Sequence, residues 1–279
     1  MDKNRQWIPT GVPSFDPVIK GGFPAGSFVL LLGEVGAGSV EFVYTSMLML
    51  AELKKEQAPL KPGFRLPEKI VYISFTKLRE NVLQSVATLN VADVANVEDM
   101  LTFVDLSSDY FAKTGVPRHW LTDGAVTLDG FVAATKNKTL REALIDALEA
   151  HAPNNLVIID SITDLMRESG GENFTRNDLI SLLKVLERVS KQWNACIYAL
   201  LTAHIFERNV EEEVSDCADG VLVFNWHALG NNQRQRMMYI KKFRGLMPYL
   251  EDDNVVLFET RVSASQGFEV SNIREIQGR

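Results

Sequence analysis

The chain has 279 residues, of which 46% are hydrophobic and 23% are charged, and its formal net charge is -7. This composition is typical of a globular protein with a sizeable core and excludes an intrinsically disordered chain. The negative balance argues against broad binding to the phosphate backbone of nucleic acids. No apolar run approaches the ~20 residues needed to cross a bilayer, and the polar N-terminus does not fit a signal peptide, so a cytoplasmic protein without a membrane segment is expected.

The sequence contains no internal repeat, low-complexity tract or long linker. Residues 1–279 are therefore expected to form one large domain. The two cysteines, Cys196 and Cys217, lie in apolar surroundings and have no CxxC spacing. This pattern favours reduced thiols in the core over a disulfide or a metal site.

Four short apolar runs predict buried strands, because they are too short for typical buried helices. They comprise residues 27–32, 70–75, 156–160 and 197–201. Helical patterns lie between them, and two of these begin with the spacing of a capping box. The capping pairs are Thr139 with Glu142 and Thr175 with Asp178.

The pattern changes near residue 220, after which short strands follow one another without helices. These strands are predicted at residues 220–226, 235–243, 255–259 and 267–270. The earlier alternation of strands and helices predicts right-handed crossovers and a parallel sheet covered on both faces. The predicted fold class is therefore α/β, with a mainly parallel twisted sheet and a β-rich C-terminal edge.

Residues 105–138 are the least regular part of the sequence. They mix polar and apolar residues and contain three glycines and a proline. This composition predicts either a long functional loop or a small excursion with short strands.

A glycine-rich turn follows the first predicted strand and precedes a helix. Backbone N–H groups at such a helix start can hold phosphate, which the helix dipole also favours. The P-loop motif GxxxxGK[ST] adds a lysine for the β- and γ-phosphates and a hydroxyl for Mg²⁺. Here Ser39 stands at the lysine position and Val40 at the hydroxyl position. A tight turn without a ligand is the alternative interpretation.

The candidate nucleotide-binding residues of this turn share the spacing of the P-loop glycines and the helix start that follows them. They are Gly33, Gly36, Ala37, Gly38, Ser39 and Val40.

Motifs on both sides of the turn resemble, in their order, the KaiC branch of the RecA-like ATPases. The stretches TGVPSFD and GGFPAGS precede the turn, and LVIIDS, LTAH, ADGVL, IKKFRG and GFEV follow it. The resemblance covers nearly the whole chain, and the order of the motifs is more specific than any one of them. It implies a RecA-like fold, a nucleotide site and ring-like subunit contacts.

The sequence departs from the family at three chemically linked positions. The family usually has adjacent glutamates after the second strand, one of which polarises the attacking water, whereas this chain has Phe75, Thr76 and Lys77. The P-loop lysine and the Mg²⁺ hydroxyl are the other two missing groups. Phosphoryl transfer needs charge stabilisation and an oriented water. We therefore expect no ATP hydrolysis and assign no catalytic residue.

Three charged residues of the family pattern are retained. The resemblance implies that Asp160 supports Mg²⁺ directly or through water, although a strand-end acid held by neighbouring amides is the alternative. It also implies that Lys242 and Arg244 reach the γ-phosphate bound by a neighbouring subunit, although they could be a solvated strand face. No cofactor is assigned, and any binding of ATP with Mg²⁺ is expected to be weak.

Other charged groups receive structural interpretations. His204 follows a strand and is expected to be a hydrogen-bonded structural residue rather than a base. Arg234 and Arg236 are predicted to lie in a solvated hairpin, because no aromatic residues are interleaved with them. The acidic run at residues 211–213 is predicted to be a solvated helix start or loop.

The leading interpretation is a non-hydrolysing regulatory or scaffolding subunit. Its expected partners are copies of itself, or a related ATPase in a hetero-oligomer. A second interpretation is an ATPase whose site is rebuilt from Lys77, Lys242 or Arg244. A third is a DNA-binding recombinase paralogue, which is weakened by the net charge and by a predicted loop at residues 163–174 with Arg167 as its only basic residue. Nucleic acid is therefore not an expected partner.

Overall fold

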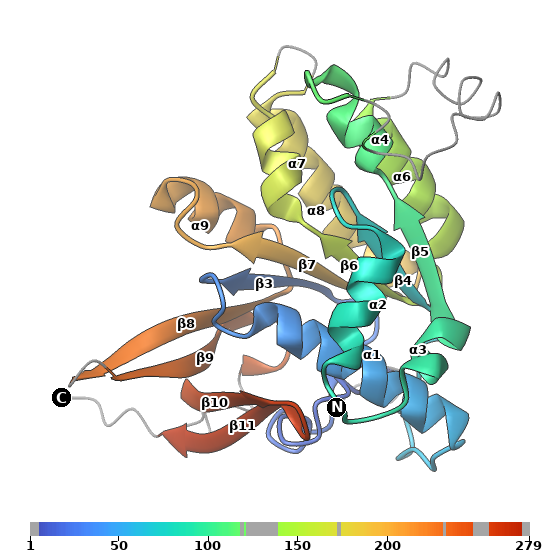
Figure 1. Ribbon diagram of the computed structural model, residues 1–279, viewed down its shortest axis with the longest axis vertical. Helices are drawn as coiled ribbons and strands as arrows, with labels where there is room; N and C mark the ends of the chain where they lie inside the picture. Colours follow the sequence, from blue (N-terminus) through green and yellow to red (C-terminus); the bar gives the residue numbers. More distant parts are fainter. Residues whose placement is uncertain are drawn as a thin grey trace.

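The computed structural model describes residues 6–117, 120, 139–171, 174–230, 233–247 and 257–274. Within these residues, eleven strands form one large sheet and one small one (Figure 1). The strands are β1 (Trp7–Ile8), β2 (Phe23–Pro24), β3 (Phe28–Gly33), β4 (Ile70–Ser74), β5 (Leu101–Asp105), β6 (Leu156–Asp160), β7 (Cys196–Thr202), β8 (Gly220–Gly230), β9 (Gln233–Phe243), β10 (Leu257–Ser263) and β11 (Gly267–Arg274).

The large sheet has nine strands in the order β11-β10-β9-β8-β3-β7-β6-β4-β5. The strands from β8 to β5 in this order pair in parallel, whereas β8, β9, β10 and β11 pair antiparallel. The four strands predicted as the core are adjacent, in the order β3-β7-β6-β4. The predicted α/β class, the mainly parallel sheet and the β-rich C-terminal edge are therefore confirmed.

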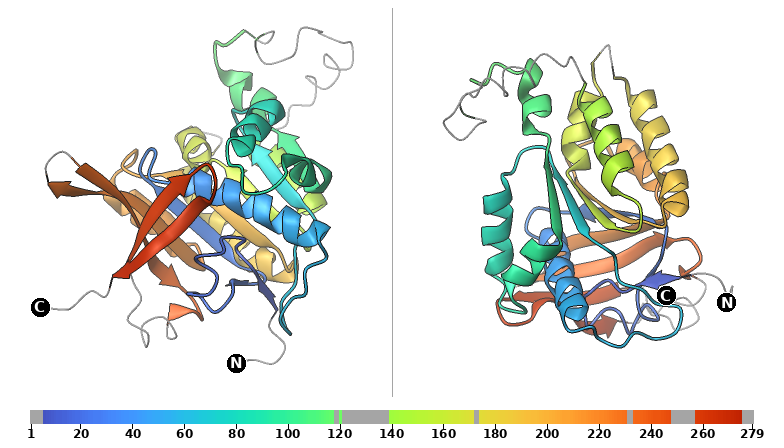
Figure 2. Two further views of the ribbon diagram at one scale, coloured as in Figure 1. Left: turned by 60° about the horizontal axis from the view of Figure 1, so that its bottom comes forward. Right: turned by 90° about the vertical axis from the view of Figure 1, so that its right-hand side faces the viewer.

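Helices cover both faces of the sheet, as predicted. The helices α1, α2 and α3 pack on one face, and α6, α7, α8 and α9 pack on the other (Figure 2). The helical segments are α1 (Ser39–Lys55), α2 (Arg79–Ala87), α3 (Val94–Met100), α4 (Ser107–Tyr110), a 3₁₀ turn (Phe111–Lys113), α6 (Leu140–His151), α7 (Ile162–Glu168), α8 (Arg176–Gln192) and α9 (Arg208–Asp216).

The starts of α6 and α8 are set by local hydrogen bonds. Thr139 and Glu142 form a reciprocal capping box at α6, and Thr175 and Asp178 form another at α8. Each box satisfies two N–H groups that the first turn of a helix leaves without intrahelical partners. Both predicted capping boxes are confirmed.

The expectation of a loop at residues 163–174 was wrong over its first half, because α7 begins at Ile162 and ends at Glu168. The Ser161 side chain caps this helix by accepting a hydrogen bond from the backbone N–H of Asp164. The side chains of Ile162, Leu165 and Met166 are buried against the sheet. Tertiary burial thus stabilises a helix of seven residues that is too short to stand out as a periodic pattern.

Only part of the irregular stretch at residues 105–138 belongs to the described residues. It contains α4 and the 3₁₀ turn that follows β5. The prediction of a functional loop or short strands falls mainly on residues 118–119 and 121–138, which lie outside the described residues.

Cys196 and Cys217 are both buried, as predicted. Within the described part of the chain, no helix is long and apolar enough to cross a bilayer.

Asp16 organises the segment that precedes β2. Its carboxylate accepts hydrogen bonds from the N–H and hydroxyl groups of Thr10, at 2.8 and 2.7 Å, and from the N–H of Gly11, at 3.2 Å. The carbonyl oxygen of Thr10 in turn accepts a hydrogen bond from the Ser46 hydroxyl on α1. The carboxylate therefore holds the N-terminal turn against the helix of the candidate site.

This buried carboxylate predicts a pH dependence of stability. Burial raises the pKa of Asp16 from 3.8 to about 6, although its hydrogen bonds with Thr10 and Gly11 oppose the shift. The folded chain then binds a proton more tightly than the unfolded chain does. The stabilisation that this tighter proton binding gives to the folded chain is fully present below pH 3.8. It is lost as pH rises through about 6. The loss is on the order of 3 kcal/mol.

We expect Asp16→Asn to flatten this part of the pH profile, because its side chain does not titrate. Urea unfolding of both proteins across this pH range measures the effect. An equally steep fall in the variant's free energy of unfolding would contradict the assignment to Asp16.

Candidate functional site

The candidate site begins at the turn between β3 and α1, at the carboxyl end of the parallel strands (Figure 1). Gly36 and Gly38 adopt φ angles of 74° and 114°, in the left-handed region that favours glycine. A Cβ atom on Gly33 would lie 2.5 Å from the Ser39 hydroxyl oxygen. All three glycines of the motif are therefore required by the shape of this turn.

The backbone polarity of the turn suits an anion. Within the described residues, the N–H groups of Gly36, Gly38 and Ser39 donate no hydrogen bond. The carbonyl oxygens of Val35 and Gly36 accept from Trp226 Nε1 at 3.1 Å and from Arg236 Nε at 3.0 Å. The β8–β9 hairpin thus binds the carbonyl oxygens, while N–H groups at the start of α1 stay available.

Arg236 corrects the expectation of a fully solvated hairpin. Its guanidinium group lies over the ring of Trp226, 4.5 Å from the ring centroid, and its side chain is partly buried. Trp226 and Arg236 are directly opposite in the pairing of β8 with β9. Arg234, on the same strand, is exposed as predicted. Strand pairing, which the sequence pattern did not reveal, supplies the aromatic partner of Arg236.

Glu34 and His204 lie beside the turn. Glu34 accepts a hydrogen bond from the backbone N–H of Trp226, and its other carboxylate oxygen is 3.2 Å from His204 Nε2. The backbone N–H of His204 donates to Glu211 at 2.7 Å. These contacts agree with a structural role for His204.

Glu211 is buried, so the prediction of a solvated acidic run was wrong for this residue. It shares the inner side of α9 with Val214 and Ser215, which are also buried. The next two residues of the run, Glu212 and Glu213, are exposed as predicted. The helical arrangement thus separates one acid of the run from the other two.

Asp160 ends β6 and is buried, with 8% of its surface exposed. Its Oδ2 atom accepts hydrogen bonds from Lys77 Nζ at 2.7 Å and from the Tyr72 hydroxyl at 2.5 Å. Burial lowers the pKa of Lys77, but the charge of Asp160, its hydrogen bond to Lys77 and the charges of Tyr44 and Asp164 together raise this pKa overall. Burial, together with the charge of Asp160, raises the pKa of Tyr72 well above its usual value. Asp160 therefore faces a charged ammonium group and a neutral phenol.

The turn after β4 holds Lys77 in place. The buried hydroxyl of Ser74 accepts from the N–H groups of Thr76 and Lys77, at 3.3 and 2.8 Å. It also donates to the carbonyl oxygen of Lys77 at 2.9 Å. These hydrogen bonds fix the backbone of Lys77, from which its side chain reaches Asp160. The sequence offered Lys77 among several candidates for a rebuilt site, and the structure brings it to Asp160.

Mg²⁺ is the metal that the family resemblance implies, and the residues present do not fit it. Mg²⁺ requires near-octahedral oxygen ligands. One oxygen of Asp160 is already hydrogen-bonded to Lys77 and Tyr72, and Val40 has no side-chain oxygen. No group of three or more His, Cys, Asp or Glu side chains among the described residues could hold a metal.

Lys242 and Arg244 lie away from the turn of their own chain. Lys242 is opposite Val221, near the start of β8, whereas the turn follows Gly33, which pairs with Phe224. Lys242 Nζ is 3.3 Å from a carboxylate oxygen of Asp216, and Arg244 Nη1 is 3.4 Å from one of Glu187. The structure therefore does not bring this basic pair together with the glycine-rich turn. Its role toward a neighbouring subunit stays a prediction.

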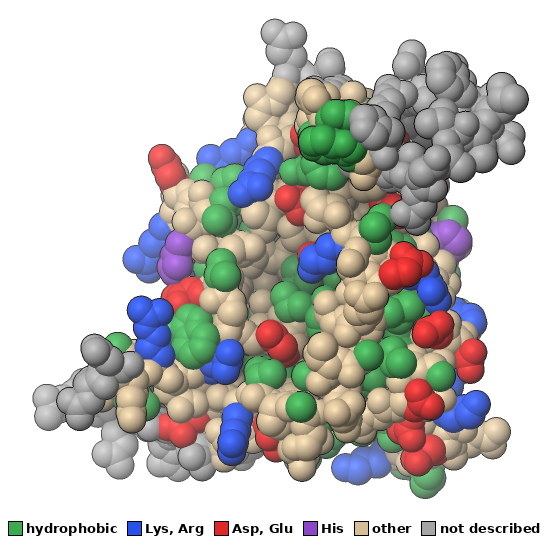
Figure 3. All heavy atoms as spheres, viewed as in Figure 1, with side chains coloured by type: hydrophobic (Ala, Val, Ile, Leu, Met, Phe, Trp, Pro, Cys, Tyr) green, Lys and Arg blue, Asp and Glu red, His purple; other side chains and the backbone are tan. Residues whose placement is uncertain are grey.

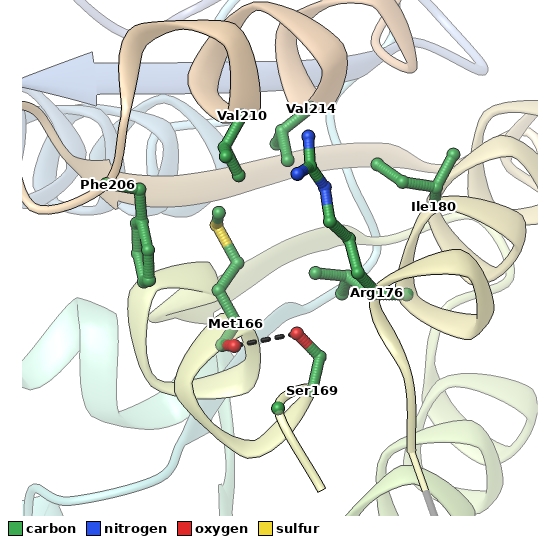
Figure 4. Close-up of a pocket in the computed structure, with 9 residues that line it drawn as sticks. Met166, Ser169, Arg176, Ile180, Phe206, Val210 and Val214 are labelled. Atoms are coloured by element: carbon green, nitrogen blue, oxygen red, sulfur yellow. Dashed lines mark hydrogen bonds between the residues drawn. The ribbon is translucent and has the colours of Figure 1, made fainter.

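A hollow lies between α7, α8 and α9, on the face of the sheet opposite α1 (Figure 4). It has a volume of about 220 Å³, and Arg176 lies at its edge, ion-paired with Glu213. The Ser169 hydroxyl, one of its few polar groups, donates to the Met166 carbonyl. Its lining is mostly hydrophobic, so it lacks the convergent polar groups of a catalytic site. The hydrophobic lining comprises Met166, Leu179, Ile180, Phe206, Val210 and Val214.

Comparisons with known proteins agree with this architecture. A KaiC-like protein of known structure from the hyperthermophilic archaeon Pyrococcus horikoshii OT3 superposes with a TM-score of 0.62 and 18% sequence identity, over 96% of this chain and 100% of that chain. Among curated proteins, no sequence matches significantly. The sequence profile of the KaiC ATPase family matches residues 60–251, which is more than half of the chain. The chain therefore belongs to the KaiC family of ATPase domains.

Proposed function

We propose that this KaiC-family chain does not hydrolyse ATP and acts as a regulatory or scaffolding subunit. The observation that carries the proposal is the ion pair between Lys77 and Asp160, at 2.7 Å. It engages the retained carboxylate at a site whose sequence already lacks the P-loop lysine, the metal-binding hydroxyl and the water-polarising glutamate. Phosphoryl transfer depends on positioning and on stabilising the charge of the transferred group. Each of the missing groups serves one of these requirements.

The proposed partners are other protein chains, either copies of this chain or a related ATPase. Lys242, near the end of β9, and Arg244, just after it, support this because they lie too far from the glycine-rich turn of their own chain to serve it. Nucleic acid is a poor fit. The face in Figure 3 carries acidic and basic side chains interspersed with one another, rather than a continuous basic strip. A protein that follows the DNA backbone concentrates lysine and arginine on one surface.

A second candidate function is an ATPase with a rebuilt site. Lys77 and Arg236 favour it, because each adds a positive charge to the candidate site. Lys77 lies beside the retained Asp160, and Arg236 contacts the glycine-rich turn. Neither residue replaces the glutamate that orients the attacking water. The non-hydrolysing subunit is therefore the better supported proposal.

Phosphate release tests the proposed function. The purified chain alone is expected to release no phosphate from ATP above the buffer background, with or without Mg²⁺. Asp160→Ala is the control that identifies a contaminating ATPase, whose activity would be the same in both preparations. Release that scales with protein concentration and disappears in Asp160→Ala would favour the rebuilt ATPase instead.

A further inference from the structure

We propose that Lys77 is the resident cation of this site, and that its ammonium group stands in for the divalent metal ion beside Asp160. Asp160 would then bind no divalent metal ion, because the ammonium group of Lys77 takes that place. This inference rests on the proposed function, because it concerns the same site and names the positive charge that occupies it.

The sheet topology brings Lys77 to this position. Strands β4 and β6 are parallel neighbours, and Ser74 is directly opposite Asp160 in their register. Lys77 follows Ser74 by three residues, so the turn after β4 carries it over the end of β6. The three hydrogen bonds between Ser74 and this turn fix its backbone. The backbone of Lys77 is thus held beside the end of β6, within reach of Asp160 for its ammonium group.

The negative charge of Asp160 is already paired with the positive charge of Lys77. The side chains of Asp160 and Lys77 are 11% and 38% exposed, so water screens their attraction only in part. A divalent ion at Asp160 would lie close to the ammonium group and be repelled by it. The Tyr72 hydroxyl, which donates to the same carboxylate oxygen, further reduces the capacity of that oxygen to bind a metal.

Other oxygen groups near Asp160, within the described part of the chain, are already engaged. Asp164 accepts hydrogen bonds from the hydroxyl groups of Ser161, at 2.7 Å, and Tyr110, at 3.3 Å. It is therefore engaged at the start of α7. The Ser39 hydroxyl lies against Gly33, and Val40 is apolar. Mg²⁺ and Mn²⁺ bind mainly through oxygen ligands, often from one or two carboxylates together with phosphates. The ion pair engages one oxygen of the carboxylate that would serve.

Binding of Mn²⁺, followed by electron paramagnetic resonance on the full chain, tests the proposal. The wild-type chain is expected to show no Mn²⁺ binding that depends on Asp160. Lys77→Met frees the carboxylate and is expected to gain Mn²⁺ binding that depends on Asp160, which wild type lacks. Lys77→Arg keeps the positive charge and is expected to behave like wild type.

Two controls isolate the site. Arg79→Met removes a neighbouring ion pair, between Arg79 and Glu98, and is expected to bind no additional Mn²⁺. Lys77→Met combined with Asp160→Asn is expected to lose the binding gained by Lys77→Met. Mn²⁺ is also expected to raise the melting temperature of Lys77→Met and not that of wild type.

Mn²⁺ binding by the wild-type chain that Asp160→Asn abolishes would overturn the proposal. So would a folded Lys77→Met variant that binds Mn²⁺ no better than wild type. If Lys77→Met does not fold, the comparison of wild type with Asp160→Asn decides the question by itself. Phosphate release that persists in EDTA would overturn the proposed function but not the resident cation, whereas Mn²⁺ binding by wild type without phosphate release would do the reverse.

Discussion

Lys77→Met is expected to lower the free energy of unfolding by about 3 kcal/mol, the lower end of the range for breaking one side of a buried ion pair. The variant leaves the carboxylate of Asp160 buried with the Tyr72 hydroxyl as its remaining hydrogen-bond donor. The lower end applies because the side chain of Lys77 is 38% exposed, so water reaches part of the pair.

A double-mutant cycle measures this coupling. Adding Asp160→Asn to Lys77→Met is expected to restore part of the stability that Lys77→Met alone removes. A neutral amide costs less to bury than an unpaired carboxylate. Arg79→Met is the matched control, since its ion pair with Glu98 is exposed. Its effect is expected to stay within about 0.5 kcal/mol. Urea unfolding of wild type, Lys77→Met, Asp160→Asn, their combination and Arg79→Met gives these values, and equal losses in Lys77→Met and Arg79→Met would contradict a special role for the partly buried pair.

Ser39→Lys combined with Val40→Thr is expected to tighten ATP binding by one to two decades. A charge-assisted hydrogen bond to phosphate contributes roughly 1.5–3 kcal/mol, which corresponds to that range of affinity. The wild-type turn supplies backbone N–H groups and the helix dipole but has Glu34 beside it. We therefore expect wild-type ATP binding no tighter than a Kd of about 100 μM.

If Lys77 takes the place of the metal ion, the gain in ATP affinity should depend on Mg²⁺ only after Lys77 is removed. With Lys77 in place, the engineered chain is expected to bind ATP almost equally in Mg²⁺ and in EDTA. Adding Lys77→Met is expected to make binding tighter in Mg²⁺, because Asp160 and the new threonine can then contribute oxygen atoms. Turnover is not expected in either variant, since Thr76 does not replace the missing glutamate.

Isothermal titration calorimetry measures these affinities, and the single Val40→Thr variant shows how much the hydroxyl contributes without the lysine. Low-micromolar, Mg²⁺-dependent binding by the wild-type chain would contradict both the weak site and the resident cation. It would place the rebuilt ATPase ahead of the scaffolding subunit.

Local patterns in the sequence determined the architecture. The core strands β3, β4, β6 and β7 were predicted because runs of buried apolar residues are visible in any short window. The starts of α6 and α8 were predicted for a similar reason, since a capping box involves residues only three positions apart. The order of the short motifs along the chain then indicated the KaiC family.

The arrangement of the candidate site was decided by the tertiary structure. The sequence identified the glycine-rich turn, and it offered Lys77 among several possible cations without a partner. The pairing of Lys77 with Asp160 joins residues 83 positions apart, and Arg236 reaches the carbonyl oxygen of Gly36 across 200 positions. Such contacts follow from the order and register of strands in the sheet, which depend on the packing of the whole core and leave no periodic trace in the residues themselves.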